Sequence, residues 1–157
     1  MPFTVLLVCT GNTCRSAMAE GILKSMVPAE HRDAICVESA GTAGLSGAPA
    51  TAYAREVCAE RGVDIRSHES SALTQEVLER AHLVLGMTHD HVTQVGAMAP
   101  EAAGRTFLLS EFADGTDVDV PDPIGAPKEE YERTYVMLEE YLAKSMPTIL
   151  RLAGEEE

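Results

Sequence analysis

Short runs of apolar residues alternate along the chain with longer stretches in which apolar residues recur at helical spacing. The apolar runs predict strands at residues 3–8, 34–38, 82–86 and 105–109, because a strand buried on both faces shows no polar alternation. Helical spacing predicts helices at 16–26, 50–61, 88–98 and 128–152, and another that begins after Thr74 as its N-cap. Gly62 is expected just past the second helix, and Pro147 is expected to kink the last one.

The order of these elements predicts an α/β fold. Strands that alternate with helices form right-handed crossovers and a parallel sheet, here a three-layer sandwich. We find no repeat or linker in the 157 residues, which predicts one domain over residues 1–157. Ligands of such sheets bind at the carboxyl ends of the strands. Three loops therefore matter: the one after Val8, the one after Glu38, and the Asp-, Gly- and Pro-rich segment 110–127, which is expected to be a long loop.

Composition and charge exclude several classes of protein. The formal net charge of −13 disfavours nucleic-acid binding, where phosphate contacts from Lys and Arg dominate affinity. No run of eighteen apolar residues and no basic leader segment occur, so we expect no membrane contact and a cytoplasmic location. The sequence does not give the oligomeric state, and a monomer is the default expectation. Four cysteines without a Cys-x-x-Cys pair predict neither a disulfide framework nor a structural zinc site. The motif His89-Asp90-His91 is no metal site either, because side chains two apart on a helix diverge.

The segment after the first strand carries the chemistry: Cys9-Thr10-Gly11-Asn12-Thr13-Cys14-Arg15-Ser16. It links a buried strand to a helix, whose N-terminus offers unpaired N–H groups and the positive end of a dipole. Gly11 and Asn12 tolerate the left-handed backbone that a curled, anion-binding loop requires. A cysteine at the mouth of such a nest is stabilised as the thiolate and becomes a nucleophile. Arg15 can grip two phosphate oxygens, and Ser16 can donate a hydrogen bond to the sulfur.

This segment resembles the phosphate loop of the low-molecular-weight protein tyrosine phosphatases. The likeness extends over nearly the whole chain and includes Ser39-Ala40-Gly41-Thr42, Ser67-His68 and Asp122-Pro123. It implies a four-stranded parallel sheet flanked by helices, phosphorylated proteins or peptides as substrates, and no metal or organic cofactor. It also implies a covalent phosphocysteine intermediate.

The resemblance assigns a role to each residue of the site. Cys9 is the nucleophile, Arg15 binds phosphate, and Asp122 is the general acid and then the base. From composition alone Asp122 is one candidate of four, beside Asp114, Asp117 and Asp119. The remaining residues implied are the phosphate-binding Thr10, Gly11, Asn12, Thr13, Cys14 and Ser16, and the loop-supporting Ser39 and His68.

Two departures from the tyrosine-specific pattern bear on the substrate. Thr13 replaces a bulkier aliphatic residue and resembles the protein-arginine phosphatase branch. Its hydroxyl can pair with a planar, polar guanidinium; the alternative is a packing role alone. Ile124 follows Asp122-Pro123 where aromatic residues usually stand, and Leu45 also lacks an aromatic ring. The sequence therefore favours phosphoarginine, with phosphotyrosine as the alternative.

Cysteine positions raise two further hypotheses. Cys14 shares its loop with Cys9, so oxidation could join them in a reversible disulfide that protects the nucleophile. A thiol-dependent arsenate reductase has the same Cys-x5-Arg loop and is a more distant alternative. That chemistry requires additional cysteines after the third strand, and residues 83–97 contain none.

Overall fold

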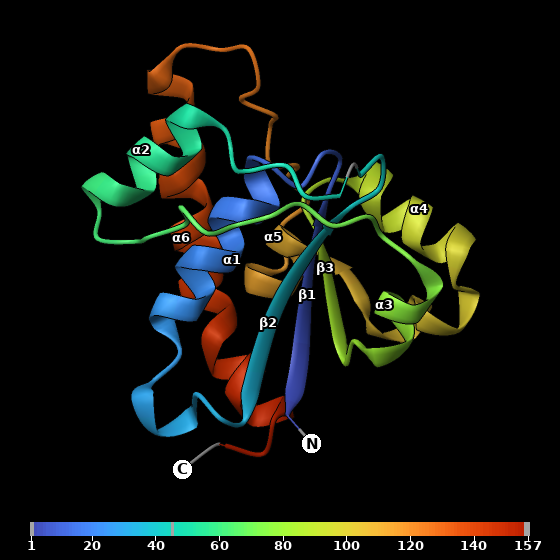
Figure 1. The fold of residues 1–157 in the computed structure, drawn as a ribbon. Helices are drawn as coiled ribbons and strands as arrows, with labels where there is room; N and C mark the ends of the chain where they lie inside the picture. Colours follow the sequence, from blue (N-terminus) through green and yellow to red (C-terminus); the bar gives the residue numbers. More distant parts are fainter. Residues whose placement is uncertain (1, 45, 156–157) are drawn as a thin grey trace.

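The computed structural model describes residues 2–44 and 46–155 as one α/β unit built on a parallel sheet (Figure 1). Its strands are β1 (Phe3–Cys9), β2 (Ile35–Gly41), β3 (Leu83–Gly86) and β4 (Thr106–Leu108), in the spatial order β2-β1-β3-β4. The neighbouring strands pair in parallel throughout the sheet. The fold class predicted from the alternation of apolar runs and helical segments is confirmed.

Helices cover both faces of the sheet, as the two sides of Figure 1 show. One face packs against α1 (Arg15–Met26), α2 (Ala52–Glu60), α5 (Leu109–Asp114) and α6 (Lys128–Leu152). The other packs against α3 (Gln75–Arg80), α4 (His89–Met98) and a short 3-10 helix, Pro100–Arg105; a second short 3-10 helix, Ala29–His31, precedes β2. None of the helices within the described ranges has the length and apolarity needed to cross a bilayer.

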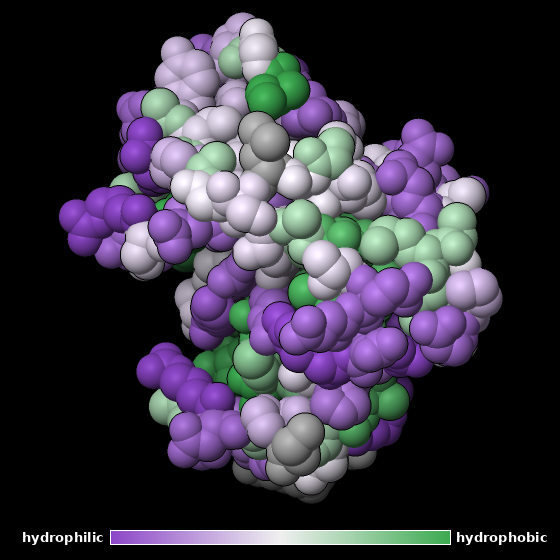
Figure 2. All heavy atoms as spheres, turned by 45° about the vertical axis from the view of Figure 1, so that its right-hand side comes forward, coloured by the Kyte–Doolittle hydropathy of each residue, from purple (hydrophilic) through white to green (hydrophobic). Residues whose placement is uncertain are grey.

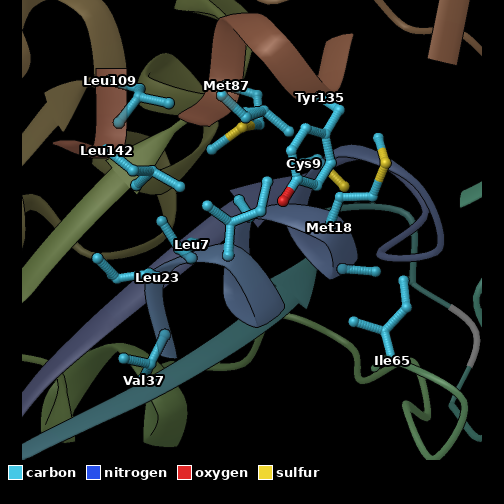
Figure 3. Close-up of a cluster of buried hydrophobic side chains, with 14 of the residues drawn as sticks. Leu7, Cys9, Met18, Leu23, Val37, Ile65, Met87, Leu109, Tyr135 and Leu142 are labelled. Carbon is cyan, nitrogen blue, oxygen red and sulfur yellow. The ribbon is translucent and has the colours of Figure 1, made fainter. Parts of the chain in front are cut away.

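The central strand β1 supplies both cores because its side chains alternate between the two faces of the sheet. Leu7 and Cys9 point to the side of α1 and α6, where Figure 3 shows them among Met18, Tyr135 and Leu142. Leu6 and Val8 point to the opposite core. All residues of β1 from Val5 onward are buried, which explains the unbroken apolar run. The outer surface is mostly polar in the view of Figure 2, with apolar side chains in small groups.

Two sequence predictions about the secondary structure are wrong in extent. The second strand does not end at Glu38 but continues to Gly41, because each residue up to Gly41 pairs in register with β1, and Gly41 pairs with Cys9. The segment predicted as a long loop after residue 109 begins instead with a helix, α5. Leu109 is fully buried and Phe112 packs against Phe107, so tertiary packing orders this turn. The helix ends at Gly115, whose φ of 77° is left-handed.

The remaining elements agree with their predictions within two or three residues. Thr74 caps α3 by accepting a hydrogen bond from the Val77 N–H, and Gly62 follows α2 with a φ of 78°. Helix α6 has the predicted bounds and continues through Pro147.

Backbone hydrogen bonds bring the loops at the carboxyl edge of the sheet together. After β2, the Thr42 N–H donates to the carbonyl oxygen of Cys9 at 2.9 Å, and the Ala43 N–H donates to that of Thr10 at 3.0 Å. On the other side of β1, the Met87 N–H donates to Val8, and the Val120 N–H donates to Met87. The segment after β1 is therefore held between the loops that follow β2 and β3, with the 110–127 segment beside it.

Candidate active site

The 9–16 loop curls back on itself between β1 and α1, and a single residue makes the turn possible. Asn12 has a φ of 58°, in the left-handed region that Asn visits more readily than most residues. Gly11 does not adopt a positive φ, so the sequence prediction is confirmed for Asn12 and wrong for Gly11. Asn12 is fully buried, so each of its polar groups needs a partner.

The side chain of Asn12 finds those partners within the loop and behind it. Its amide nitrogen donates to the hydroxyls of Ser16 (2.7 Å) and Ser39 (2.9 Å), and its amide oxygen accepts from the Ser71 N–H (2.8 Å). His68 donates from Nε2 to the Asn12 carbonyl oxygen at 2.7 Å. Ser39 and His68 are therefore both in contact with Asn12.

Glu20 completes this network, and the sequence analysis missed it. The Ser39 hydroxyl donates to Glu20 Oε1 at 2.5 Å, and His68 Nδ1 lies 4.0 Å from the same oxygen. Its position in the sequence could have indicated this contact, because Glu20 follows Ser16 by one helical turn on α1 and therefore lies on the same face of the helix.

The sulfur of Cys9 lies at the bottom of the curl, where two donors meet it. Ser16 Oγ is 2.9 Å away and the Asn12 N–H donates to Sγ at 3.3 Å. Because the Ser16 oxygen already accepts from Asn12, the Ser16 proton is free to point at the sulfur. The N-terminus of α1 adds the positive end of its dipole. The arrangement stabilises a negative charge on Sγ.

Arg15 is the buried cation of the site, with only 5% of its surface exposed. Its Nη1 donates to the Val120 carbonyl oxygen at 3.1 Å, and its Nη2 lies 3.5 Å from Asp122 Oδ2. Its Nε is buried and has no partner among the described residues, so this N–H is available to an anion.

A cavity of about 250 Å³ joins these groups. Its lining contains Cys9, Thr10, Gly11, Thr13, Cys14, Arg15, Asp122 and Ile124. Of the four aspartates that the sequence left open, only Asp122 lines it. Asp117 and Asp119 pair with His89, and Asp114 pairs with Lys144. Asp122 is partly exposed and its Oδ1 accepts from the Ile124 N–H at 3.1 Å, which turns the chain after Pro123.

The residues expected to select the substrate are only partly placed by the structure. Thr13 lines the cavity, and its carbonyl oxygen accepts from the Thr51 N–H at 3.0 Å. Ile124 lines the cavity and is 60% exposed. Leu45 lies outside the described residues.

The four cysteines differ in their surroundings. Cys14 lines the cavity, is buried, and has its Sγ 3.5 Å from Thr51 Oγ1 and 3.6 Å from the Tyr131 hydroxyl. Burial raises the pKa of Tyr131. Cys58 is fully buried on α2, and its burial raises the pKa of the thiol to about 12. Burial and the nearby Glu38 carboxylate also raise the pKa of Cys36. Both of these thiols lie outside the cavity lining.

His91 is a second residue that the sequence analysis did not assign to the site. Its Nε2 lies 2.9 Å from Thr10 Oγ1, on the α4 side of the 9–16 loop. Burial, and then the charge of Arg15, lower the pKa of His91 to about 4. In the part of the chain that the structure describes, no group of His, Cys, Asp and Glu side chains is arranged to hold a metal ion.

Known proteins resemble this chain in sequence and fold. The family model described as "Low molecular weight phosphotyrosine protein phosphatase" matches residues 4–153. A protein-arginine-phosphatase of Geobacillus stearothermophilus is 40% identical over 131 residues, which cover 83% of this chain and 85% of that protein. The low molecular weight protein-tyrosine-phosphatase Etp of Escherichia coli K12 is 38% identical over 136 residues, 87% of each chain.

Solved structures agree. The YwlE arginine phosphatase of G. stearothermophilus superposes with a TM-score of 0.86 at 37% identity, covering 98% of this chain and 95% of that one. The low molecular weight protein tyrosine phosphatase of T. tengcongensis gives 0.87 at 39% identity, covering 93% of this chain and 99% of that one. The chain therefore belongs to the low molecular weight phosphotyrosine protein phosphatase family, whose members are cysteine-dependent phosphatases.

Proposed function

We propose that this chain hydrolyses phosphorylated side chains of proteins or peptides in two steps, with Cys9 as nucleophile and Asp122 as acid and base. The observation that carries the proposal is the shared cavity, which Cys9, Arg15 and Asp122 line together, with Arg15 Nη2 only 3.5 Å from Asp122 Oδ2. Phosphoryl transfer needs these three functions: attack in line, stabilisation of charge and protonation of the leaving group. No metal or organic cofactor takes part in the proposed steps.

In the first step the Cys9 thiolate attacks phosphorus. A sulfur–phosphorus bond forms, the bond from phosphorus to the substrate oxygen or nitrogen breaks, and the leaving group takes a proton from Asp122. The Ser16 hydroxyl and the Asn12 N–H hold the thiolate before attack. Arg15 Nε and the N–H groups of the curled loop receive the charge of the phosphate oxygens.

In the second step a water molecule attacks the phosphocysteine. Asp122 takes a proton from that water and the sulfur–phosphorus bond breaks. Inorganic phosphate is released and the Cys9 thiolate is regenerated. In the free enzyme Asp122 lies 3.5 Å from Arg15 Nη2. A bound phosphate dianion competes with Asp122 for that guanidinium. The Asp122 carboxyl group is then released from Arg15 and can protonate the leaving group.

The mechanism is tested by two substitutions and a matched control. Cys9→Ser should abolish turnover, since the hydroxyl is a much weaker nucleophile at neutral pH. Asp122→Ala should slow turnover most for substrates with poor leaving groups, while Asp117→Ala, which removes a carboxylate outside the cavity, should leave it unchanged. Normal turnover in Cys9→Ser would refute the mechanism.

We propose phosphoarginine as the preferred substrate, with phosphotyrosine as the alternative. Two threonines, Thr10 and Thr13, line the cavity, and the described residues that line it include no aromatic side chain. A planar guanidinium can use such polar groups, whereas a phenol ring gains most from aromatic contacts. The related proteins include both a protein-arginine-phosphatase and a protein-tyrosine-phosphatase, so the choice depends on the wall of the cavity.

A paired assay decides between the two substrates. Steady-state rates on phosphoarginine and phosphotyrosine peptides are compared for wild type, Thr13→Ile and the exposed control Thr93→Ile. We expect wild type to prefer phosphoarginine, Thr13→Ile to shift toward phosphotyrosine, and the control to behave as wild type. A wild-type preference for phosphotyrosine that Thr13→Ile leaves unchanged would assign Thr13 to packing alone.

Our proposal also includes reversible protection of Cys9 by Cys14. Hydrogen peroxide oxidises the Cys9 thiolate to the sulfenic acid, and the Cys14 thiol displaces water from it to form the disulfide. Both sulfurs belong to residues that line the same cavity, but Cys14 must first leave Thr51 and Tyr131. Dithiothreitol should restore activity after peroxide in wild type and in Cys36→Ser, but not in Cys14→Ser. Full recovery of Cys14→Ser would contradict the idea.

The compartment and the assembly state complete the proposal. A reducing compartment such as the cytoplasm suits an enzyme that depends on a thiolate, and its four cysteines have free thiols in the structure. We propose that the monomer is the active form, because Cys9, Arg15 and Asp122 of a single chain already line one cavity together. Light scattering during size-exclusion chromatography, with activity measured across the peak, tests this point.

A further inference from the structure

One polar cluster beside the cavity, centred on the buried ring of His91, has no part in the mechanism above. It lies at the start of α4, on the opposite side of β1 from Asn12's partners, and consists of the buried His91, the half-buried Thr88 and the exposed Thr10. His91 is 2% exposed, yet its ring carries two polar nitrogens. A buried imidazole of this kind is stable only if both nitrogens have partners.

The contacts of His91 determine which nitrogen carries the proton. The backbone N–H of Thr88 donates to Nδ1 at 3.1 Å, so Nδ1 presents its lone pair. In a neutral imidazole the proton is then on Nε2, which donates to Thr10 Oγ1 at 2.9 Å. The Thr88 hydroxyl oxygen accepts from the His91 N–H and closes the capping box of α4. The first turn of α4 therefore fixes the ring and aims one N–H at the 9–16 loop.

Thr10 connects this ring to the cation of the site. Its hydroxyl oxygen accepts from His91 Nε2 and also lies 3.5 Å from Arg15 Nη2, which approaches as a donor. Arg15 Nη1 is held separately by the Val120 carbonyl oxygen. The guanidinium plane is thus fixed at both terminal nitrogens, and this leaves Nε free for an anion.

We propose that His91 is a positioning residue of the phosphatase, which fixes the Arg15 guanidinium for phosphate binding through the Thr10 hydroxyl. The proposal rests on the function proposed above for the same cavity. His91 does not touch the reacting atoms. Its contribution is to hold Thr10 in one rotamer, so that the oxygen faces Nη2 and the plane of the guanidinium cannot rotate.

The charge state of His91 supports this role. Burial and the charge of Arg15 both lower its pKa, to about 4, while the carboxylates Asp90, Asp119 and Asp122 oppose the shift. The ring is therefore neutral at the pH of ordinary assays. A neutral ring can accept at Nδ1 and donate at Nε2 at once, whereas the imidazolium could only donate and would repel Arg15.

Two substitutions of His91 separate positioning from helix capping. Gln places an amide nitrogen near the position of Nε2 and can still donate to Thr10. Asn is shorter, reaches only the position of Nδ1, and loses that donor. We expect His91→Asn to lower kcat/KM and the affinity for inorganic phosphate by about tenfold, on the order of one lost hydrogen bond next to a charged group. His91→Gln should stay within about threefold of wild type in both measurements.

Thr10→Val tests the same link from its other end, because this substitution removes the hydroxyl with little change in the shape of the side chain. It should lower both quantities as much as His91→Asn, and the double variant should show no further loss, since both changes remove the same link. Thr74→Ala is the stability control: it removes the cap of α3, away from the cavity, and should lower the melting temperature while phosphate affinity is unchanged.

Titration calorimetry with inorganic phosphate keeps this test independent of the proposed reaction. If no variant and no wild-type protein turned over either peptide, the proposed function would fail, but the phosphate affinities would still test His91. If His91→Asn bound phosphate as tightly as wild type, or if the two single losses added in the double variant, the positioning role would be overturned. His91 would then be a helix cap alone.

Discussion

Gly41, the last residue of β2, should be the position where the smallest possible change does the most damage to the site. A Cβ added there would lie 2.5 Å from the Thr10 carbonyl oxygen, 3.1 Å from the Asn12 nitrogen and 3.1 Å from the Gly11 carbonyl carbon. All of these atoms are backbone atoms of the 9–16 loop. Gly41 also pairs with Cys9 in the sheet, so β2 cannot move away without breaking that pairing.

The size of the effect of Gly41→Ala follows from these distances. Carbon and carbonyl oxygen settle at about 3.3 Å or more, so the loop must shift by about 0.8 Å at Thr10. A misplacement near 1 Å costs roughly 100-fold in rate when it displaces catalytic groups. We therefore expect kcat/KM to fall about 10- to 100-fold. Overpacking should also lower the free energy of unfolding by about 1–3 kcal/mol.

The assay compares kcat/KM on an aryl phosphate with denaturant unfolding, for Gly41→Ala and Gly96→Ala side by side. Gly96 lies within α4, and a Cβ added there meets nothing within 4 Å. Gly96→Ala should keep wild-type activity and gain about 1 kcal/mol in stability, the difference in helix propensity. A folded Gly41→Ala enzyme with wild-type kcat/KM would refute the claim that β2 holds the loop in its active shape.

Three further predictions concern buried groups. Asn12→Ala and Asn12→Gly both lose the side-chain hydrogen bonds of Asn12, but only alanine is strained at a backbone φ of 58°. In urea unfolding, the Asn12→Ala variant should therefore have a free energy of unfolding about 1 kcal/mol lower than that of Asn12→Gly. Between pH 8 and pH 4 the unfolded chain protonates His91, whose native pKa is lowered to about 4. Wild type should therefore lose about 3 kcal/mol of unfolding free energy that His91→Asn does not lose, and a pH-independent difference between the two would contradict this. Cys58, fully buried with its pKa raised to about 12, should react with iodoacetamide at pH 8 only after denaturant is added, as mass mapping would show.

The sequence predicts the centre of this site because its chemistry is local. A buried strand, a curled segment and a helix follow one another within residues 3–26, so the loop between Cys9 and Arg15 can be assigned from neighbouring residues alone. The structure confirms Asn12 as the left-handed turn residue. Asp122 could not be reached in this way, because three other aspartates lie in the same segment, and only the family resemblance singled it out.

Contacts between distant parts of the chain explain what the sequence did not predict. His91 contacts Thr10 although the two residues are 81 positions apart in the sequence. The motif around His91 raised only the question of a metal site, and helix geometry excluded one. Helix α5 is too short to show a helical periodicity in the sequence. The burial of Leu109 stabilises it instead. The last residues of β2, from Ser39 to Gly41, resemble a turn by composition. They are held in the strand by pairing with β1 up to Cys9.

Local donors, and not the overall field of the protein, must account for phosphate binding in this chain. A net charge of −13 repels a phosphate dianion at long range. At short range attraction outweighs this repulsion, because Arg15 is only 5% exposed and a buried donor interacts more strongly with an anion than a donor in water does. Such donors work only if they are fixed before the anion arrives. The networks on the two sides of β1 supply that rigidity: Glu20, Ser39 and His68 hold the Asn12 turn, and His91 holds Thr10 against Arg15. An acidic protein can therefore bind a dianion because its few donors are held in place by partners that carry no net positive charge of their own.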